Sequence, residues 1–375
     1  MTPVNPSISP SSLIDDNAGL AAVCQRLAAT GVIGLDTEFV RERTYYPRPG
    51  LIQLSDGEIV ALVDPLGISD FGPLAELLTD PAVTKLMHAY DEDLDVLELL
   101  LGVAPHNVFD TQLAGAFVGY GFSSSYADLV SGLLGVVLDK GLTRSDWLRR
   151  PLSAAQLHYA ASDVVYLPPL YERLSRELAA LDRGPWLEEE VEHRRRASVG
   201  GKQPGAAYLK VRGRGALAPA QHGVLRALCR WREVEAMARD IPRRHLLTDE
   251  VLLKLAAEPA LDAASLANIE GLSRPARTRY GQVLLRCIDA ARTQGPDGAD
   301  RPVSLRPYAG LLTRLKEVVR IEATRLGIPP ALLASRRTLD AFLVSVLKNG
   351  RDIPTEFQGW RSTVVTGALL DCIHQ

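Results

Sequence analysis

The chain has 375 residues, of which 46% are hydrophobic and 23% charged, the composition of a folded globular protein rather than a disordered or fibrous one. Its length predicts two or three domains. No apolar stretch reaches the length of a membrane span, and the first residues lack the basic and apolar regions of a signal peptide. Four scattered cysteines without metal-ligand spacing argue against zinc sites and disulfides, and they predict a reducing, cytoplasmic location.

The formal net charge of −3 conceals a strong asymmetry between the two halves of the chain. Residues 1–190 carry 12 basic and 27 acidic side chains, whereas residues 191–375 carry 30 basic and 18 acidic ones. An acidic half joined to a basic half indicates a metal-charged site coupled to a module that binds a polyanion. A chance distribution of surface charge is the alternative.

The first part of the chain combines an early group of strands with later alternation of helix and strand. The hydrophobic pattern predicts, in order, a helix at 13–30, a buried strand from 32, strands at 50–54 and 59–63, a helix at 70–78, a strand at 83–88, a helix at 91–101, a strand at 107–109 and helices from 111 to about 134. The first three strands are expected to be antiparallel. Together these elements predict an α/β fold, a mixed sheet flanked by helices.

A charged loop at 139–151 and a long helix at 153–180, interrupted at Pro168–Pro169, close this first domain. Glycine-rich and proline-rich stretches then divide the rest of the chain. The predicted organisation is a disordered lead-in at 1–12, an α/β domain at 13–190, a linker at 191–215, an all-helical domain at 216–294, a linker at 295–304 and a second all-helical domain at 305–375.

Two acids interrupt the apolar strand that begins at Val32. Asp36 and Glu38 are two residues apart, so their side chains project from the same face. Burying two like charges together is costly unless a cation lies between them, and carboxylate oxygens suit Mg²⁺ or Mn²⁺ better than zinc. Taken alone, the pair is equally well explained as solvated surface, so further acids must reach the same point.

Two other segments supply such acids. Asp93 lies one turn inside a predicted helix that follows a strand, at the sheet edge where catalytic groups gather. Tyr159 and Asp163 are four residues apart on one helix face, and the small residues between them let that helix approach the sheet closely. Asp110 also follows a strand, where we expect it to cap a helix or support the site from outside.

Four carboxylates and a tyrosine from three segments fit phosphodiester hydrolysis by two divalent ions about 3.5–4 Å apart. Such ions clamp the attacking and leaving oxygens and offset the charge that repels hydroxide from a phosphodiester. The tyrosine hydroxyl would orient the water or help deprotonate it.

The segments LDTEFVRERTYYPRPGLIQL, HAYDEDLDVL and YAASDVVYL, in that order and spacing, resemble the three exonuclease motifs of the DEDD superfamily, tyrosine subtype. LDKGLTRSDWLRRPLS, before the third motif, resembles the ribonuclease D family in particular. The resemblance covers nearly the whole chain and implies a ribonuclease H-like exonuclease domain followed by two HRDC-like helical domains.

The resemblance implies that two Mg²⁺ or Mn²⁺ ions are bound by Asp36, Glu38, Asp93 and Asp163, with Tyr159 orienting the water. It also implies a 3′–5′ exoribonuclease that releases nucleoside 5′-monophosphates from tRNA precursors and other small structured RNAs. None of the five positions departs from the motifs. The expected enzyme is a monomer without an obligate protein partner and acts away from membranes.

Residues in or beside these motifs are candidates for the substrate path, because a 3′-terminal nucleotide must be unstacked and held. They are Phe39, Gln53, His88, Lys140, Arg144 and Trp147, with Arg274 and Arg277 as phosphate contacts in the first helical domain. Tyr45 and Tyr46 either stack on bases or pack internally. The arginines around Trp231 either contact phosphate or form a solvated face with Trp231 in the core.

Two alternatives to an exoribonuclease stay open on the sequence. A DNA repair or proofreading exonuclease would have the same fold, because no residue pattern reveals a reader of the ribose 2′-hydroxyl. A catalytically silent RNA-binding scaffold is opposed by the intact acid cluster, which a scaffold would not need. A helicase accessory is disfavoured because the chain lacks a GxxxxGK[ST] phosphate loop.

Overall fold

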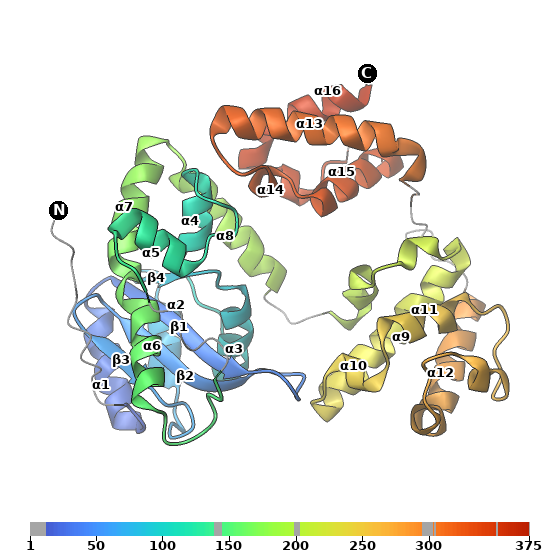
Figure 1. Cartoon of the computed structure of the whole chain (residues 1–375), viewed down its shortest axis with the longest axis horizontal. Helices are drawn as coiled ribbons and strands as arrows, with labels where there is room; N and C mark the ends of the chain where they lie inside the picture. The colour runs from blue at the N-terminus through green and yellow to red at the C-terminus, as the bar shows by residue number, and fades with distance from the viewer. Residues whose placement is uncertain are drawn as a thin grey trace. The chain divides into compact units, whose positions relative to one another are not determined.

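The computed structural model describes residues 13–138, 145–198, 203–294, 303, 305–349 and 352–374 (Figure 1). The chain forms two compact units. Unit 1 comprises Met1–Val40, Arg48–Val199 and Leu305–Gln375, and unit 2 comprises Arg41–Pro47 and Gly200–Ser304. The predicted lead-in at 1–12 lies outside the described residues.

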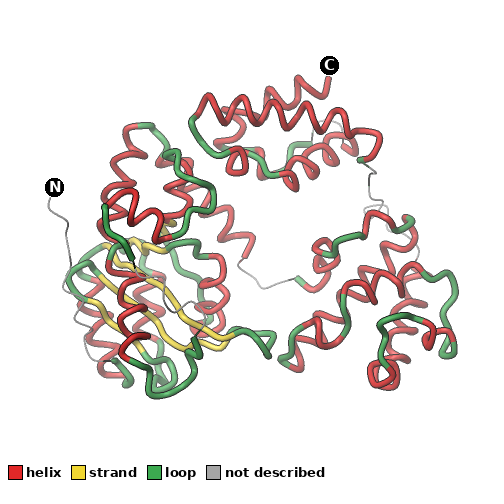
Figure 2. The backbone as a smooth tube through the Cα atoms, in the orientation of Figure 1, coloured by secondary structure: helices red, strands yellow, loops and turns green. Residues whose placement is uncertain are grey.

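The described strands all belong to unit 1 and form one five-stranded sheet in the order β3-β2-β1-β4-β5 (Figure 2). The strands are β1 (Val32–Val40), β2 (Arg48–Ser55), β3 (Val60–Val63), β4 (Thr84–Met87) and β5 (Val108–Asp110). β1, β2 and β3 pair antiparallel, whereas β4 and β5 join parallel to β1. The predicted mixed sheet, with its first three strands antiparallel, is confirmed, and a turn at Asp56–Gly57 joins β2 to β3.

Helices cover both faces of this sheet. In chain order they are α1 (Asn17–Ala28), α2 (Gly72–Thr79), α3 (Asp91–Leu101), α4 (Thr111–Phe117), α5 (Tyr126–Leu134), α6 (Ala154–Val165), α7 (Leu167–Ala180) and α8 (Gly184–Ser198). Helices α6 and α7 pack on β1, and Figure 1 shows α6 crossing in front of the sheet. The break predicted at Pro168–Pro169 falls at Tyr166, because the prolines occupy the first turn of α7, where no backbone N–H is required.

The C-terminal helices of unit 1 share its hydrophobic core. They are η5 (Arg306–Tyr308), α13 (Ala309–Leu326), α14 (Pro330–Leu333), α15 (Arg336–Asn349), η6 (Thr355–Phe357), the π-helical η7 (Ser362–Thr366) and α16 (Gly367–His374). Phe117 of α4 contacts the rings of Trp186 in α8 and Trp360 near the C-terminus, with centroids 6.3 and 5.2 Å away. This all-helical segment is therefore part of the same compact body as the sheet.

Unit 2 is helical and has its own core. Its elements are η1 (Pro204–Lys210), η2 (Arg214–Ala216), α9 (Pro219–Arg239), α10 (Arg243–Leu246), α11 (Asp249–Ala257), η3 (Ser265–Asn268) and α12 (Arg274–Gln294). The stretch expected as a linker at 191–215 includes the end of α8 and η1, which packs on α9. Val211 is buried in the core of unit 2, so its apolar side chain holds this stretch in place.

The segment Arg41–Pro47, which connects β1 to β2 in the chain, folds as part of unit 2. The Tyr45 hydroxyl donates to buried Glu233 at 2.8 Å, and Asp240 accepts from the backbone N–H groups of Tyr45 and Tyr46 at 2.9 and 3.0 Å. Of the two roles open to Tyr45, internal packing is the one observed. Among the helices described in either unit, none is long and apolar enough to cross a membrane.

Gly34 lets α6 and α7 approach β1 closely. A Cβ atom at Gly34 would lie 3.0 Å from the Val164 carbonyl oxygen and 3.2 Å from a Leu167 methyl. We expect Gly34→Ala to lower the free energy of unfolding by about 1–3 kcal/mol, because the added methyl overfills a packed contact. Gly310→Ala is the matched control, since nothing lies within 4 Å of that position. Equal midpoints of thermal unfolding for the two variants would contradict this account.

Candidate active site

Strand β1 presents Asp36 and Glu38 toward α6. Gly34, two residues before Asp36 on the same face, contacts α6 and α7 directly, and alternation carries Asp36 and Glu38 to that face as well. A bulge in the β1–β2 pairing follows at Glu38/Phe39. Bulges re-aim side chains, and Phe39, which follows Glu38 in the chain, is half-buried.

Helix α6 brings Asp163 to the same point. Ser153 and Gln156 form a capping box that starts this helix, and the fully buried Ala160 and Ala161 allow its close approach to the sheet. Carboxylate oxygens of Asp36, Glu38 and Asp163 all lie within 4.8 Å of one another. Three acids that are distant in sequence thus meet in one cluster.

Asp93 joins from the first turn of α3. Its carboxylate is 8% exposed and accepts a short hydrogen bond from the Thr37 hydroxyl of β1. Ala89, which lies between β4 and α3, has a φ of 56°. This left-handed conformation turns the chain sharply from the strand into the helix. Asp110 supports this turn: it caps α4 by accepting from the Leu113 N–H at 2.9 Å and accepts from the Tyr90 N–H at 3.2 Å. Its predicted structural role is confirmed.

Burial, and for two of them the charges of other acids in the cluster, raises the pKa of the four carboxylates. Burial raises the pKa of Asp36 well above its usual range, and the charges of Asp93, Asp163 and Glu38 raise it further. Burial, then Asp163 and Asp93, raises the pKa of Glu38 to about 8. Burial also raises the pKa of Asp93 and of Asp163 to about 7, partly opposed by hydrogen bonds from Thr37 and Tyr159 respectively. A divalent cation among these hard oxygen donors would relieve that repulsion, so the donor set fits Mg²⁺ or Mn²⁺.

Tyr159 hydrogen-bonds to Asp163 one turn along α6, which fits its predicted place on the same helix face. Burial raises the pKa of Tyr159, and the charges of Asp163 and Glu38 raise it further, so the phenol stays protonated at neutral pH. The Trp147 ring lies 6.2 Å from the Tyr159 ring and is 2% exposed, which places Trp147 in the core beside the site. Trp147 also packs against Gly50 of β2, where a Cβ would come within 2.7 Å of it.

Gln53 pairs with Asp36 across the β1–β2 ladder, so both side chains lie on the face toward α6. Gln53 is fully buried, and within the described part of the chain neither atom of its amide group has a hydrogen-bond partner. Because buried amides almost always have hydrogen-bond partners, the Gln53 amide is suited to a ligand or an ordered water.

His88 follows β4; its Nδ1 lies 2.9 Å from the Thr111 hydroxyl, and burial lowers its pKa to about 4.

The remaining predicted substrate contacts lie outside the described residues or in unit 2. Lys140 and Arg144 lie outside the described residues. Arg274 is exposed and Arg277 half-buried in the first turn of α12 in unit 2. Of the arginines around Trp231, Arg232 is 4% exposed and pairs with Asp249 at 2.7 Å. Trp231 itself packs against the core of unit 2, the structural alternative considered for it.

Sequence reasoning missed two residues that build the site. Thr37 lies between the two acids of β1, and its hydroxyl orients Asp93. Tyr126 of α5 donates to the Ser162 carbonyl at 3.3 Å and accepts from the Tyr166 N–H at 3.2 Å, bracing α6 next to Asp163. The position of Thr37 between the two acids of one strand could have indicated a role at the site. No sequence pattern indicates the contact between Tyr126 and α6.

Comparison with known proteins identifies the family. Residues 12–179 match the model of a 3′–5′ exonuclease domain, and residues 221–288 match that of the HRDC domain. Over 366 residues the chain is 38% identical to the ribonuclease D of Pseudomonas paraeruginosa, covering 96% of this chain and 97% of that protein. This chain belongs to the ribonuclease D family. It is a 3′–5′ exoribonuclease.

Two comparisons with Escherichia coli ribonuclease D agree with this assignment. The chain is 34% identical to that protein over 372 residues, covering 97% of this chain and 98% of the other. The crystal structure of the E. coli enzyme matches with a TM-score of 0.87 over 96% of this chain and 98% of that one. The ribonuclease D family implied by the resemblance is thus confirmed, as are the expected exonuclease domain, an HRDC domain and a helical C-terminal region.

The carboxylate cluster predicts a characteristic dependence of stability on pH. The pKa of Glu38 is about 8 in the folded protein against 4.5 for an ordinary glutamate. Between these values the folded state binds more protons than the unfolded state, so stability falls as the pH rises through this window. In metal-free protein at pH 8, Glu38→Gln should therefore raise the free energy of unfolding, on the order of 2 kcal/mol, and at pH 4 the gain should vanish.

Thermal unfolding in chelator at the two pH values measures this effect. Glu58→Gln, in the exposed turn between β2 and β3, is the matched control and should leave the midpoint unchanged at both. A stabilisation by Glu38→Gln that is the same at pH 4 and pH 8 would show that repulsion within the cluster is not its cause.

Proposed function

We propose that this ribonuclease removes nucleotides one at a time from the 3′ ends of RNA and releases nucleoside 5′-monophosphates by a two-metal mechanism. The observation that carries the proposal is the convergence of Asp36, Glu38 and Asp163 within 4.8 Å, with Asp93 beside them and all four pKa values raised. These four residues would hold two Mg²⁺ or Mn²⁺ ions. When bound, such ions supply positive charge that stabilises the developing charge on the phosphodiester and its leaving oxygen.

The chain's own groups position the reactants. The Tyr159 phenol keeps its proton at neutral pH, so it holds the attacking water by hydrogen bonding instead of acting as a phenolate base. Of the two roles open to this tyrosine, orientation is thus the one we assign. Trp147, packed beside the Tyr159 ring, would limit the movement of that ring.

Substrate contacts would come from both units. At the site, the half-buried Phe39 ring is suited to the terminal base or sugar, and the unpartnered Gln53 amide to a polar group of the nucleotide or its water. His88, neutral because of its lowered pKa, would line the same path.

Unit 2 offers contacts for the RNA backbone, where Arg274 and Arg277 would bind phosphates. It also contains a hollow of about 760 Å³ whose lining includes three acidic residues and the basic residues Arg41, Lys210, Arg232, Arg243 and Arg244. Apart from the buried Arg232, these cations are exposed, and exposed cations along such a hollow favour a phosphate chain through counterion release.

We further propose tRNA precursors and other small structured RNAs with 3′ extensions as substrates. The matching E. coli protein is described as an exoribonuclease involved in structured RNA processing, which supports this substrate class. A cytoplasmic monomer is the state in which we expect the enzyme to act, and its four free cysteines suit a reducing compartment.

The test is degradation of matched RNA and DNA strands, labelled at either end, with Mg²⁺, with Mn²⁺ and with chelator. We expect metal-dependent release of mononucleotides from the 3′ end, with RNA preferred. A preference for DNA would move the assignment to a repair exonuclease. No cleavage with either metal, despite retained RNA binding, would favour the scaffold alternative.

Substitutions separate catalysis from binding. Asp36→Ala and Asp163→Ala should each lower kcat by roughly a thousandfold or more while RNA affinity in chelator stays within about twofold, because these acids serve the metals. Tyr159→Phe should lower kcat by about a hundredfold, since it removes only the hydroxyl that holds the water. Single-turnover cleavage and filter binding measure the two quantities. Parallel loss of RNA binding in the aspartate variants would contradict this division of labour.

A further inference from the structure

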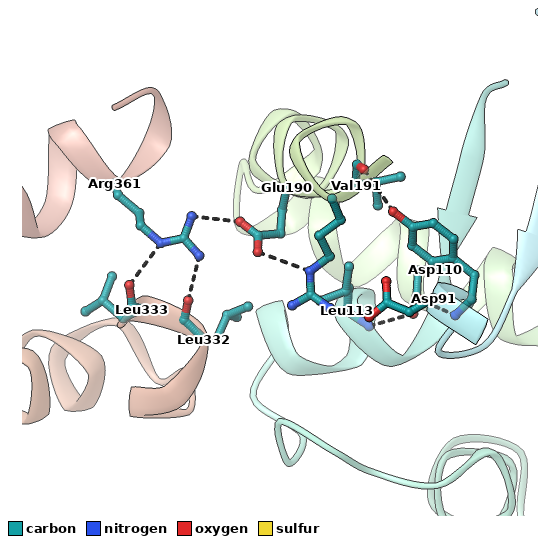
Figure 3. Close-up of polar contacts among 10 residues, drawn as sticks. Asp91, Asp110, Leu113, Glu190, Val191, Leu332, Leu333 and Arg361 are labelled. Carbon is teal, nitrogen blue, oxygen red and sulfur yellow. Dashed lines mark hydrogen bonds and ion pairs between the residues drawn. The ribbon is translucent and has the colours of Figure 1, made fainter. Parts of the chain in front are cut away.

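We propose that Arg361, in the C-terminal helical segment, is a positioning residue for the carboxylate site and acts through helix α8 on the first turn of α3, which carries Asp93. The inference rests on the proposed metal-binding role of Asp93. It assigns the positioning of Asp93 to a residue outside the exonuclease motifs. All the residues involved belong to unit 1, and Figure 3 shows the polar contacts among them.

The Arg361 guanidinium is held on three sides. Its Nη1 bonds the Glu190 carboxylate of α8 at 2.7 Å, and its Nε and Nη2 donate to the Leu333 and Leu332 carbonyl oxygens, each at 2.9 Å. The guanidinium carbon also lies 4.4 Å from the Trp360 ring centroid. A planar guanidinium with each edge engaged has one orientation, so it ties α14 rigidly to α8.

Glu190 transmits this contact along α8. It is 5% exposed, and its second oxygen lies 3.3 Å from Arg194 Nε on the next turn. Burial raises the pKa of Glu190, but the charges of Arg361 and Arg194 lower it more, so its net pKa lies below the ordinary value and the carboxylate stays ionised. A buried carboxylate that loses one of two cationic partners must shift or take up water.

One ion pair and one hydrogen bond then join α8 to the start of α3. Arg194 Nη1 lies 3.8 Å from the Asp91 carboxylate, and the buried Tyr90 hydroxyl donates to the Val191 carbonyl at 2.9 Å. Tyr90 is the N-cap of α3 and Asp91 is its first residue, so both adjoin Asp93 in the first turn of this helix. Because the chain enters this turn through the left-handed Ala89, outside contacts are needed to define its direction.

A second set of contacts keeps α8 against the C-terminal segment. The Trp360 backbone N–H donates to both Glu189 carboxylate oxygens, at 3.2 and 3.0 Å. The Trp360 ring stacks on Trp186 with centroids 5.2 Å apart and planes 20° from parallel. The π-helical turn η7 starts directly after Arg361, and a π-turn in a helix often marks a functional position. The C-terminal segment is thus built to fix α8 in one position.

The first measurement is hydrogen–deuterium exchange in metal-free, full-length protein. Arg361→Ala should speed exchange of the amides at residues 90–94 at least tenfold, because the relay from α14 to α3 is broken. Arg336→Ala is the matched control: it removes an exposed arginine of the same segment that pairs only along its own helix, with Asp340. It should leave the exchange at residues 90–94 unchanged.

The second measurement is calorimetric titration of Mn²⁺ into the same proteins. Arg361→Ala should weaken Mn²⁺ binding severalfold, while Arg336→Ala should not. A purely structural role would lower the unfolding midpoint without changing either readout in the folded protein. Tyr90→Phe, which deletes only the bond to Val191, keeps the test decisive if Arg361→Ala fails to fold, and it should reproduce both effects.

If folded Arg361→Ala shows unchanged amide exchange at residues 90–94, the proposal is overturned. If Arg361→Ala does not fold, the same result in Tyr90→Phe overturns it. Exchange that rises only within 305–374 would do the same, because the segment would then be docked without positioning α3. Absence of Mn²⁺ binding to the wild-type protein would instead refute the proposed metal site, and the exchange result would still decide whether the relay exists.

Discussion

The structure depends on one unfavourable interaction: four carboxylates held close together and largely out of water. Burial raises the pKa of each carboxylate, and neighbouring carboxylates raise the pKa of Asp36 and of Glu38 further. No arrangement of the surrounding apolar core removes this repulsion, since an ionised group in a poorly solvated place needs a counter-charge. The cluster therefore makes sense as a cation site, and the fold must supply the packing energy that keeps the acids in place before a cation binds.

Local features of unit 1 hold the acids together. Gly34 removes a side chain where β1 meets α6, and Ala160 and Ala161 remove bulk from the opposing face of the helix. The two elements can then approach closely enough for Asp36 and Asp163 to share one cluster. Thr37, on the other face of β1, binds Asp93 and links α3 to the same strand. Close packing thus brings the acids together from three segments.

The two units differ in how they relate to this site. The C-terminal helices belong to unit 1: they share its core, and their contacts with α8 lead to the turn that carries Asp93. Unit 2 has a separate core, to which the stretch Arg41–Pro47, directly after β1 in the chain, contributes the buried Tyr45. Consequently, the three modules suggested by glycine-rich and proline-rich breaks do not correspond to three independent bodies.

The sequence by itself determined the fold class, the ribonuclease D family and the acids and tyrosine proposed for catalysis. The fold class follows from an apolar periodicity that distinguishes strand from helix, and residue spacing puts Asp36 with Glu38, and Tyr159 with Asp163, on shared faces. The family and the complete set of site residues follow from the resemblance of whole motifs to those of known exonucleases. Tertiary structure alone decided that Trp147 and Tyr45 are buried and that Arg361 reaches Glu190 from 171 residues away. Such contacts depend on which helix faces meet after the chain folds, and residue spacing along the chain carries no record of that.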